Sequence, residues 1–281
     1  MKRKMVMYDR GIGFIDSGVG GLTVVKEAMK QLPNEKFYYL GDTARCPYGP
    51  RSEEEVKQFS FELAHFLVKK HDIKMLVIAC NTATAASLND LKKELDIPVI
   101  GVILPGSRAA IKTSKNGHIA VIGTEGTINS DQYSKELLRK NNELNITSLS
   151  CPKFASMVEK NSHHSPIAKR IVRESLLPLK NNPMDTLILG CTHYPLIKHL
   201  IQNVVGPNVE LIDSGAETIN EVSVLLDYYD LTNYNHHPDI KHIFYTTGDQ
   251  KQFYTIAREW LNKSNFDVKH IDLKELQVEN D

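Results

Sequence analysis

The fold of this chain is decided by two matching segments, Met75-Leu-Val-Ile-Ala-Cys80-Asn-Thr-Ala-Thr-Ala85 and Thr186-Leu-Ile-Leu-Gly-Cys191-Thr-His-Tyr-Pro-Leu196. In each, an apolar run and one small residue lead to a cysteine and then to a polar stretch containing threonine. Apolar runs of this kind predict buried parallel strands. Open parallel sheets form their sites at the carboxyl ends of strands, which is where both cysteines lie. We therefore expect the two thiols to face each other across a cleft.

Strands and helices are expected to alternate along the rest of the chain. Further strands are predicted at the apolar runs 11–15, 36–40, 99–102, 118–122, 146–150, 209–212 and 242–246. Helices are predicted near 22–31, 52–70, 83–95, 107–113, 130–140, 167–179, 195–204 and 251–262. The stretch 151–159 is expected to be a loop and turn. This alternation predicts an α/β fold with parallel sheets.

The order of the motifs indicates an internal repeat. The strand before Asp16 and the strand before Thr124 are separated by about the same spacing as the two cysteines. We therefore expect two doubly wound parallel-sheet domains related by a pseudo-two-fold, with the active site in the cleft between them. The predicted first domain is discontinuous, formed by residues 1–104 and 213–281, and the second domain is formed by residues 105–212.

Length and composition exclude several classes of protein. The 281 residues are 41% hydrophobic and 24% charged, with no formal net charge. This balance gives no sign of a nucleic-acid partner or of attraction to an anionic membrane. No secretory signal and no apolar run near the ~18 residues of a membrane helix is evident. A cytoplasmic protein is expected, in which all four cysteines are free thiols, and no Cys-x-x-Cys spacing supports a metal site.

The two cysteines are the first candidates for chemistry. A free thiol has a pKa near about 8.5, so little of it is the reactive thiolate at neutral pH. Helix amino termini stabilise thiolates, and both Cys80 and Cys191 precede expected helices. Each is therefore expected to act as a base, although a single cysteine after a buried strand is ordinarily a small core residue. Two thiols on opposite faces of a substrate could move a proton from one side of a carbon to the other.

Other polar residues follow the same strand ends. Asp16-Ser17 is followed by glycines that leave backbone amides free, but Thr23 breaks the pattern of a dinucleotide loop. His193 and Glu159 are candidates to assist Cys191. Neutral donors and acceptors suited to a carboxylate or an amine are supplied by Asn81, Thr82, Thr124 and Thr192. Cys46 and Cys151, which each precede proline in an expected loop, are given no catalytic role.

The motifs together closely resemble the glutamate racemases of the cofactor-independent aspartate/glutamate racemase superfamily. The matching segments are Gly13-Phe-Ile-Asp-Ser-Gly-Val-Gly-Gly-Leu-Thr23, Tyr39-Leu-Gly-Asp-Thr-Ala-Arg-Cys-Pro-Tyr-Gly49, Ala79-Cys-Asn-Thr-Ala-Thr84 and Gly190-Cys-Thr-His-Tyr-Pro-Leu196. They occur in the expected order and span most of the chain.

The resemblance implies roles for individual residues. Cys80 would act on D-glutamate and Cys191 on L-glutamate, with Asp16 assisting the first thiol and Glu159 and His193 the second. The residues implied in binding substrate are Asp16, Ser17, Tyr48, Gly49, Asn81, Thr82, Thr192 and His193. The family product enters peptidoglycan, and the family commonly forms homodimers. No cofactor is expected, because no lysine that could form a Schiff base lies in the strand-end motifs.

Three alternatives remain open at this stage. One is a relative that acts on aspartate, hydantoins or malonates, against which Arg45 and Tyr48 in the glutamate-like loop argue. Another is a cysteine hydrolase or amidase that uses one cysteine with His193 and forms an acyl-enzyme. The last is a binding protein that holds an amino acid between two lobes and tolerates loss of its cysteines.

Overall fold

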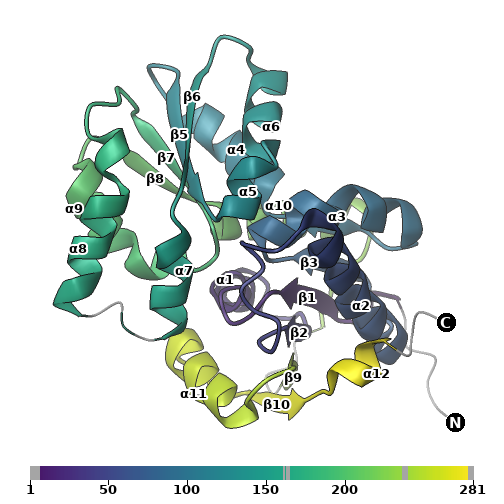
Figure 1. Cartoon of the computed structure of the whole chain (residues 1–281). Coiled ribbons are helices and arrows are strands. Elements are labelled where there is room, and N and C mark those ends of the chain that lie inside the picture. Colours follow the sequence, from purple (N-terminus) through teal and green to yellow (C-terminus); the bar gives the residue numbers. More distant parts are fainter. Residues whose placement is uncertain (1–6, 161, 163–164, 236–239, 278–281) are drawn as a thin grey trace, which may run out of the picture.

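Two parallel sheets, each flanked by helices, form the two lobes of the molecule (Figure 1). The structure is a computed structural model that describes residues 7–160, 162, 165–235 and 240–277. The strands of the first lobe are β1 (Ile12–Asp16), β2 (Phe37–Gly41), β3 (Met75–Ile78), β4 (Val99–Gly101), β9 (His242–Thr246) and β10 (Phe266–His270). Those of the second lobe are β5 (His118–Gly123), β6 (Asn145–Ser150), β7 (Thr186–Gly190) and β8 (Glu210–Asp213).

The two sheets repeat one strand order. The first sheet runs β10-β9-β2-β1-β3-β4, and the second runs β6-β5-β7-β8. The part β2-β1-β3-β4 therefore has the same order as the whole second sheet, and every strand pair is parallel. The α/β fold with two parallel-sheet domains, predicted from the alternating pattern, is confirmed.

Helices cover both faces of the sheets. In the first lobe these are α1 (Leu22–Gln31), α2 (Glu53–His71), α3 (Asn81–Glu94), α11 (Gln250–Leu261) and α12 (Leu273–Gln277). In the second lobe they are α4 (Ile103–Thr113), α5 (Glu125–Asn129), α6 (Gln132–Lys140), α7 (Pro152–Glu159), α8 (Pro166–Ser175) and α9 (Lys198–Val205). Short 3-10 helices lie at Met7–Asp9, Leu177–Leu179 and Tyr194–Ile197. Because both faces are covered, β1, β2 and β7 are buried along their whole length.

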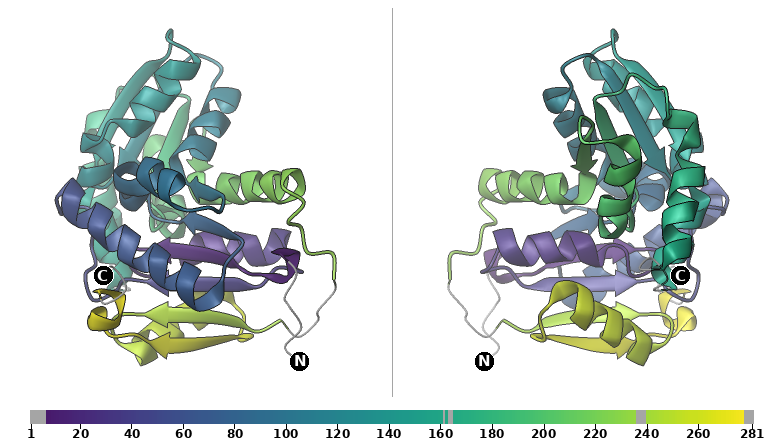
Figure 2. Two further views of the ribbon diagram at one scale, coloured as in Figure 1. Left: turned by 90° about the vertical axis from the view of Figure 1, so that its right-hand side faces the viewer. Right: turned by 90° about the vertical axis from the view of Figure 1, so that its left-hand side faces the viewer.

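The helix α10 (Ser214–Tyr228) connects the lobes and was not predicted. It packs against α1 of the first lobe and α4 of the second, and it projects from the side of the molecule at the level where the lobes meet (Figure 2). The Asp213 carboxylate caps it by accepting the N–H groups of Gly215 and Ala216 at 2.9 and 3.3 Å. A domain division after Leu104 and before Asp213 remains our proposal, although Leu104 lies inside α4 and Asp213 is the last residue of β8.

Local signals explain where other elements begin. The expected helix start at Ser52 is a capping box, in which the Ser52 hydroxyl accepts the Glu55 N–H and the Glu55 carboxylate accepts the Ser52 N–H.

The expectation of a loop over residues 151–159 was wrong, because Pro152 starts the helix α7. Strand β10 also lay outside the predicted set. Across the described ranges, no helix is both long and apolar enough to cross a bilayer.

A buried ion pair holds the chain where it returns to the first lobe. Lys74, just before β3, lies 2.6 Å from a Glu35 carboxylate oxygen and is only 1% exposed. Its ammonium also donates to the carbonyl of Leu231 at 2.7 Å and to that of Tyr8 at 2.8 Å. The other Glu35 oxygen accepts the N–H of Asn233 at 2.9 Å. These bonds fix the segment after α10 to the amino-terminal end of β3, opposite the end that Cys80 follows.

Candidate functional site

Both cysteines follow buried central strands and line the same cavity. Cys80 comes two residues after β3, and Cys191 directly follows β7. Because parallel strands present their carboxyl ends at one edge, the loops that follow neighbouring strands converge there. The residues around the cavity are Ser17, Cys46, Pro47, Tyr48, Gly49, Cys80, Asn81, Thr82, Thr124, Ala155, Cys191, Thr192 and His193. The structure thus brings most of the residues predicted from the sequence into one place, with the two thiols contributed by different lobes.

The cavity is too small for an amino acid as it stands. Its volume is about 20 Å³, which is room for about one water molecule. A wider groove of about 390 Å³ lies next to it and shares Gly49 and Thr82 with its wall. The walls of both the cavity and the groove come from both lobes.

Cys80 is the amino-terminal cap of α3. Its sulfur accepts the N–H of Ala83 at 3.5 Å and lies 3.8 Å from the Ser17 hydroxyl. The helix terminus lowers the pKa of Cys80 through this N–H group, but the expectation of a lowered pKa overall was wrong because burial outweighs it. Burial, followed by the charge of Asp16, raises the pKa of Cys80 to about 12, and the Ala83 N–H offsets only part of this.

Cys191 lies beside a histidine and not at the start of an α-helix. Its strand leads into the 3-10 helix Tyr194–Ile197, and α9 begins only at Lys198. The Cys191 sulfur lies 3.5 Å from Nδ1 of His193, and Nε2 of the same ring lies 2.6 Å from a Glu159 oxygen. These three residues therefore form a chain from the thiol to the carboxylate.

The charges of His193 and Glu159 stabilise each other. Burial lowers the pKa of His193, but its contacts with Cys191 and Glu159 raise it well above its usual value. Burial raises the pKa of Glu159, but the hydrogen bond and charge of His193 outweigh it, so that pKa is lowered. A histidine held by a carboxylate and placed beside a thiol is an arrangement suited to proton exchange.

Asp16 lies at the end of β1 and is 1% exposed. One carboxylate oxygen accepts the N–H of Gly18 at 2.9 Å and the Tyr39 hydroxyl at 3.3 Å. The other accepts the Thr192 hydroxyl at 3.4 Å, which joins it to the second lobe. Burial raises the pKa of Asp16 in spite of the charge of His193 and the backbone N–H groups. A carboxyl with a raised pKa exchanges protons more readily near neutral pH than an ordinary aspartate.

Neutral polar groups complete the walls. The hydroxyls of Thr82, Thr124 and Thr127 lie 2.9–3.3 Å from one another across the lobes. Thr127 had not been predicted, and it follows Thr124 by one helical turn in α5. The Tyr133 hydroxyl donates to the Asn81 amide oxygen at 2.7 Å. This leaves the buried Asn81 Nδ2 without a partner among the described residues, which makes it a donor available to a ligand.

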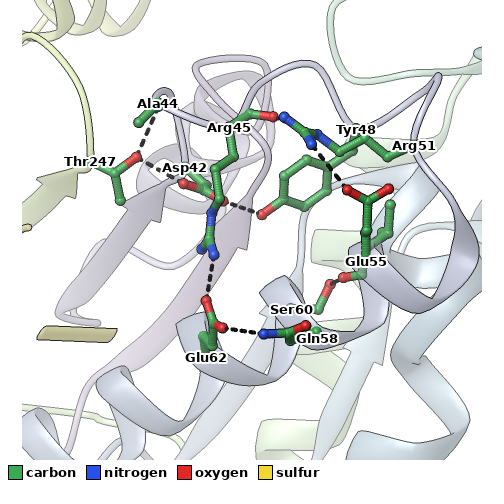
Figure 3. Close-up of polar contacts among 11 residues, drawn as sticks. Asp42, Ala44, Arg45, Tyr48, Arg51, Glu55, Gln58, Ser60, Glu62 and Thr247 are labelled. Carbon is green, nitrogen blue, oxygen red and sulfur yellow. Dashed lines mark hydrogen bonds and ion pairs between the residues drawn. The ribbon is translucent and has the colours of Figure 1, made fainter. Parts of the chain in front are cut away.

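Tyr48 lines the cavity, but its hydroxyl points elsewhere. It donates to Asp42, which also binds the Arg45 guanidinium and, through its other oxygen at 2.8 Å, the Thr247 hydroxyl (Figure 3). The Arg45 guanidinium also donates to the Glu62 carboxylate. It stacks over the Phe59 ring, with its central carbon 3.9 Å from the ring centroid. Arg45 therefore anchors the loop and is not a ligand of the cavity. Only the backbone and the ring of Tyr48 are placed to contact a substrate in the cavity.

Loss of the Tyr48 hydroxyl should reduce stability more than substrate binding. In Tyr48→Phe, the buried Asp42 carboxylate loses one charged hydrogen bond, which costs about 1.5–3 kcal/mol. We expect the midpoint of urea unfolding to fall accordingly, while KM for substrate changes less than about threefold, because the hydroxyl is directed away from the cavity. A large rise of KM at unchanged stability would contradict this assignment.

Gly20 gives the two lobes room to meet at the site. A Cβ there would lie 2.5 Å from the Thr192 hydroxyl oxygen and 2.6 Å from Cε1 of His193. Gly20→Ala must therefore displace one or both side chains. We expect kcat/KM to fall about 10- to 100-fold, as for a displacement of about 1 Å, with the melting temperature recorded as the control. Unchanged kinetics in a folded variant would show that the site tolerates the shift.

Cys46 is the functional candidate that sequence reasoning missed. Its sulfur lies 3.6 Å from the Glu159 carboxylate, and its side chain borders the cavity. Its neighbours Pro47 and Tyr48 gave a loop signal but no sign of this contact.

Cys151, by contrast, is buried in the core of the second lobe and does not reach the cavity. Within the described ranges, no three His, Cys, Asp or Glu side chains are grouped as a metal site requires.

Comparisons with known proteins identify the family. The Asp/Glu/Hydantoin racemase family model matches residues 15–222. The glutamate racemase of Carnobacterium sp. (strain St2) is 60% identical over 268 residues, which is 95% of this chain and all of the relative. A glutamate racemase isoform of Bacillus anthracis has a solved structure that is 48% identical, with a TM-score of 0.90 over 94% of this chain and 98% of its own.

A second solved structure is a glutamate racemase from Francisella tularensis in complex with D-glutamate. It is 33% identical, with a TM-score of 0.88 over 95% of this chain and 99% of its own. The resemblance drawn from the sequence motifs is therefore confirmed. The chain belongs to the Asp/Glu/hydantoin racemase family and, within it, to the glutamate racemases.

Proposed function

We propose that this protein interconverts L- and D-glutamate without a cofactor, by transfer of a proton at Cα between two cysteines. The observation that carries the proposal is that Cys80 and Cys191 line one cavity from different lobes. Each thiol has its own carboxylate nearby, Asp16 for Cys80 and Glu159, through His193, for Cys191. An acid and a base on opposite faces of one carbon are the minimum that inversion by proton transfer requires.

At the start of each direction of racemisation, one cysteine is a thiolate base and the other is a thiol acid. With L-glutamate bound, the Cys191 thiolate removes the Cα proton, and the Cys80 thiol delivers a proton to the opposite face. With D-glutamate the roles are exchanged. The high pKa of Cys80 suits the donor in the first direction, and the His193 imidazolium suits the thiolate at Cys191. For the reverse direction, the Asp16 carboxylate takes up the Cys80 proton before the thiolate attacks.

Neutral donors are suited to hold the substrate. The free Nδ2 of Asn81 and the hydroxyls of Ser17, Thr82 and Thr124 border the cavity and match the needs of carboxylates. Gly49 and Thr192 add backbone and side-chain groups to the lining of the same cavity. We expect Asp16 and His193 to face the substrate as well, since both lie beside the thiols.

The chemistry must stabilise a poor carbanion. No lysine is among the described residues around the cavity, which leaves no amine for a Schiff base to a pyridoxal cofactor. Stabilisation is instead assigned to fixed dipoles and hydrogen bonds in a site closed to water. The small volume of the cavity, about 20 Å³, supports this because it leaves little room for solvent.

The wider role follows from the product. We infer that D-glutamate is supplied for peptidoglycan synthesis, in the cytoplasm, by a homodimer. Light scattering at micromolar concentration tests the dimer, which a mass of one chain would contradict. A solved glutamate racemase of the same fold binds D-glutamate, and this observation favours glutamate over aspartate.

The test is NMR of L- and D-glutamate incubated separately with the protein in D₂O, with no added cofactor. Loss of the Cα proton signal, and convergence of both samples to zero optical rotation, is the expected result. Exchange with aspartate but not glutamate would retain the mechanism and change the substrate. If neither exchanges, the two-thiol proposal fails. An acyl-enzyme visible by mass spectrometry would then indicate a hydrolase, and binding that survives loss of both cysteines would indicate a binding protein.

A further inference from the structure

Each carboxylate beside a candidate base accepts a hydrogen bond from the opposite lobe. Asp16, in the first lobe, accepts the Thr192 hydroxyl of the second lobe at 3.4 Å. Glu159, in the second lobe, accepts the Cys46 thiol of the first lobe at 3.6 Å. The two contacts are reciprocal across the cleft. Both contacts join the two lobes at the site.

We propose that Cys46 is a positioning residue for the Cys191 half of the site, and that it holds the Glu159 carboxylate against His193 from across the cleft. The inference rests on the proposed function. It adds a third thiol to the site, with a role different from that of the two bases. Its part is to donate a hydrogen bond, and it takes no proton from the substrate.

The geometry at Glu159 supports this role. The carboxylate oxygen that the Cys46 thiol approaches is the same Oε1 that lies 2.6 Å from Nε2 of His193. The Glu159 carboxylate also accepts the backbone N–H of Val19, which belongs to the first lobe. First-lobe groups therefore contact the carboxylate from one side while His193 holds it from the other. A movement of Glu159 would displace the ring that contacts Cys191.

Gly18 shows that the contact is closely fitted. A Cβ at this position would lie 2.8 Å from the Glu159 oxygen and 3.0 Å from the Cys46 sulfur. Only glycine leaves the thiol and the carboxylate room to meet without a shift. The loop that carries Cys46 is also fixed, because Arg45 on one side and Tyr48 on the other both bind the buried Asp42 (Figure 3).

The Cys46 thiol is suited to donate a hydrogen bond and unsuited to act as a base. Burial, followed by the negative charge of Glu159, raises the pKa of its thiol far above the usual value. The proton therefore stays on sulfur throughout the working pH range. An S–H group is a weak donor, so the expected contribution is modest.

The consequence is a pH effect of defined sign. The Cys46 hydrogen bond is one of the contacts that lower the pKa of Glu159. Without it, the carboxylate is protonated at a higher pH, and the His193 imidazolium loses its partner there. The acidic limb of the pH profile of kcat, which reports groups in the enzyme–substrate complex, should then move to higher pH.

The test compares Cys46→Ala with Cys46→Ser, which differ by one hydroxyl. In Cys46→Ala we expect the acidic limb of kcat to rise by about half a pKa unit, with kcat on that limb reduced about threefold. Cys46→Ser retains a donor and should return the limb to its wild-type position. Melting temperatures of both variants separate this effect from a loss of folding, since a purely structural change does not move a pH limb.

The outcomes separate the two proposals. If the wild-type protein racemises glutamate but the Ala and Ser variants have the same acidic limb, the role of Cys46 is overturned and the proposed function stands. If the serine variant restores the limb that alanine shifts, the role is supported. If the wild-type protein does not racemise glutamate, the proposed function fails, and the role of Cys46 fails with it.

Discussion

Serine in place of Cys80 or of Cys191 is expected to lower kcat/KM for racemisation by about 10³-fold, within the range that positioned acid–base groups contribute. A hydroxyl is a far weaker acid than a thiol, so it neither gives up nor carries the proton at the required pH. Because the two enantiomers have equal free energies in solution, kcat/KM must fall by the same factor in both directions, whichever cysteine is replaced. Chiral chromatography of the products measures both.

Exchange with solvent distinguishes the two halves. With Cys191→Ser, the remaining thiol should exchange the Cα proton of D-glutamate for deuterium without inversion, and Cys80→Ser should do so only for L-glutamate. Cys151→Ala is a matched control, because this third buried thiol lies in the core of the second lobe and does not line the cavity. Turnover near the wild-type rate in either serine variant would refute two-base catalysis.

Lys74→Met is expected to lower the free energy of unfolding by about 3–5 kcal/mol, because it leaves the buried Glu35 carboxylate without its cation. Burial already raises the pKa of Glu35, and the charge of Lys74 opposes that rise. Without Lys74 the pKa rises further. A carboxyl whose pKa is raised in the folded state stabilises the protein below its unfolded pKa and loses that contribution as the pH increases through the folded value.

The loss of unfolding free energy in Lys74→Met should therefore be smaller at acidic pH. Urea unfolding at several pH values measures this. The matched control is Lys74→Met combined with Glu35→Gln, which removes the unpaired charge and keeps an oxygen for the Asn233 N–H. We expect this double variant to recover most of the stability at neutral pH. Equal stability of the single and double variants would show that the buried charge is not the cause.

The sequence was sufficient to predict the sheets and the central residues of the site. Apolar runs that end in polar residues indicate both a buried parallel strand and the edge where its neighbours also end. For this reason the strand-end positions of Asp16, Cys80, Thr124 and Cys191 are enough to predict that these residues lie together. Their catalytic and binding roles remain proposals.

What the sequence did not reveal depends on contacts between distant parts of the chain. Cys46 and Glu159 are 113 positions apart, and no local pattern in the loop predicts that they meet. Tyr133 sits on a surface helix, and nothing in its neighbours indicates that its hydroxyl reaches Asn81. The pKa of Cys80 was misjudged for a related reason, since a helix terminus is visible in sequence and the burial that outweighs it is not.

The discontinuous first sheet has a consequence for how the protein is made. On the ribosome the chain emerges from its amino terminus, so β2 is released long before β9, its neighbour in the sheet. The strands of the second lobe lie within one continuous stretch and can complete their sheet first. The first lobe is therefore finished last, and until then the outer edge of β2 is open to pairing with other nascent chains. Aggregation during expression should thus be most sensitive to changes in β2 and in the strand that eventually covers it.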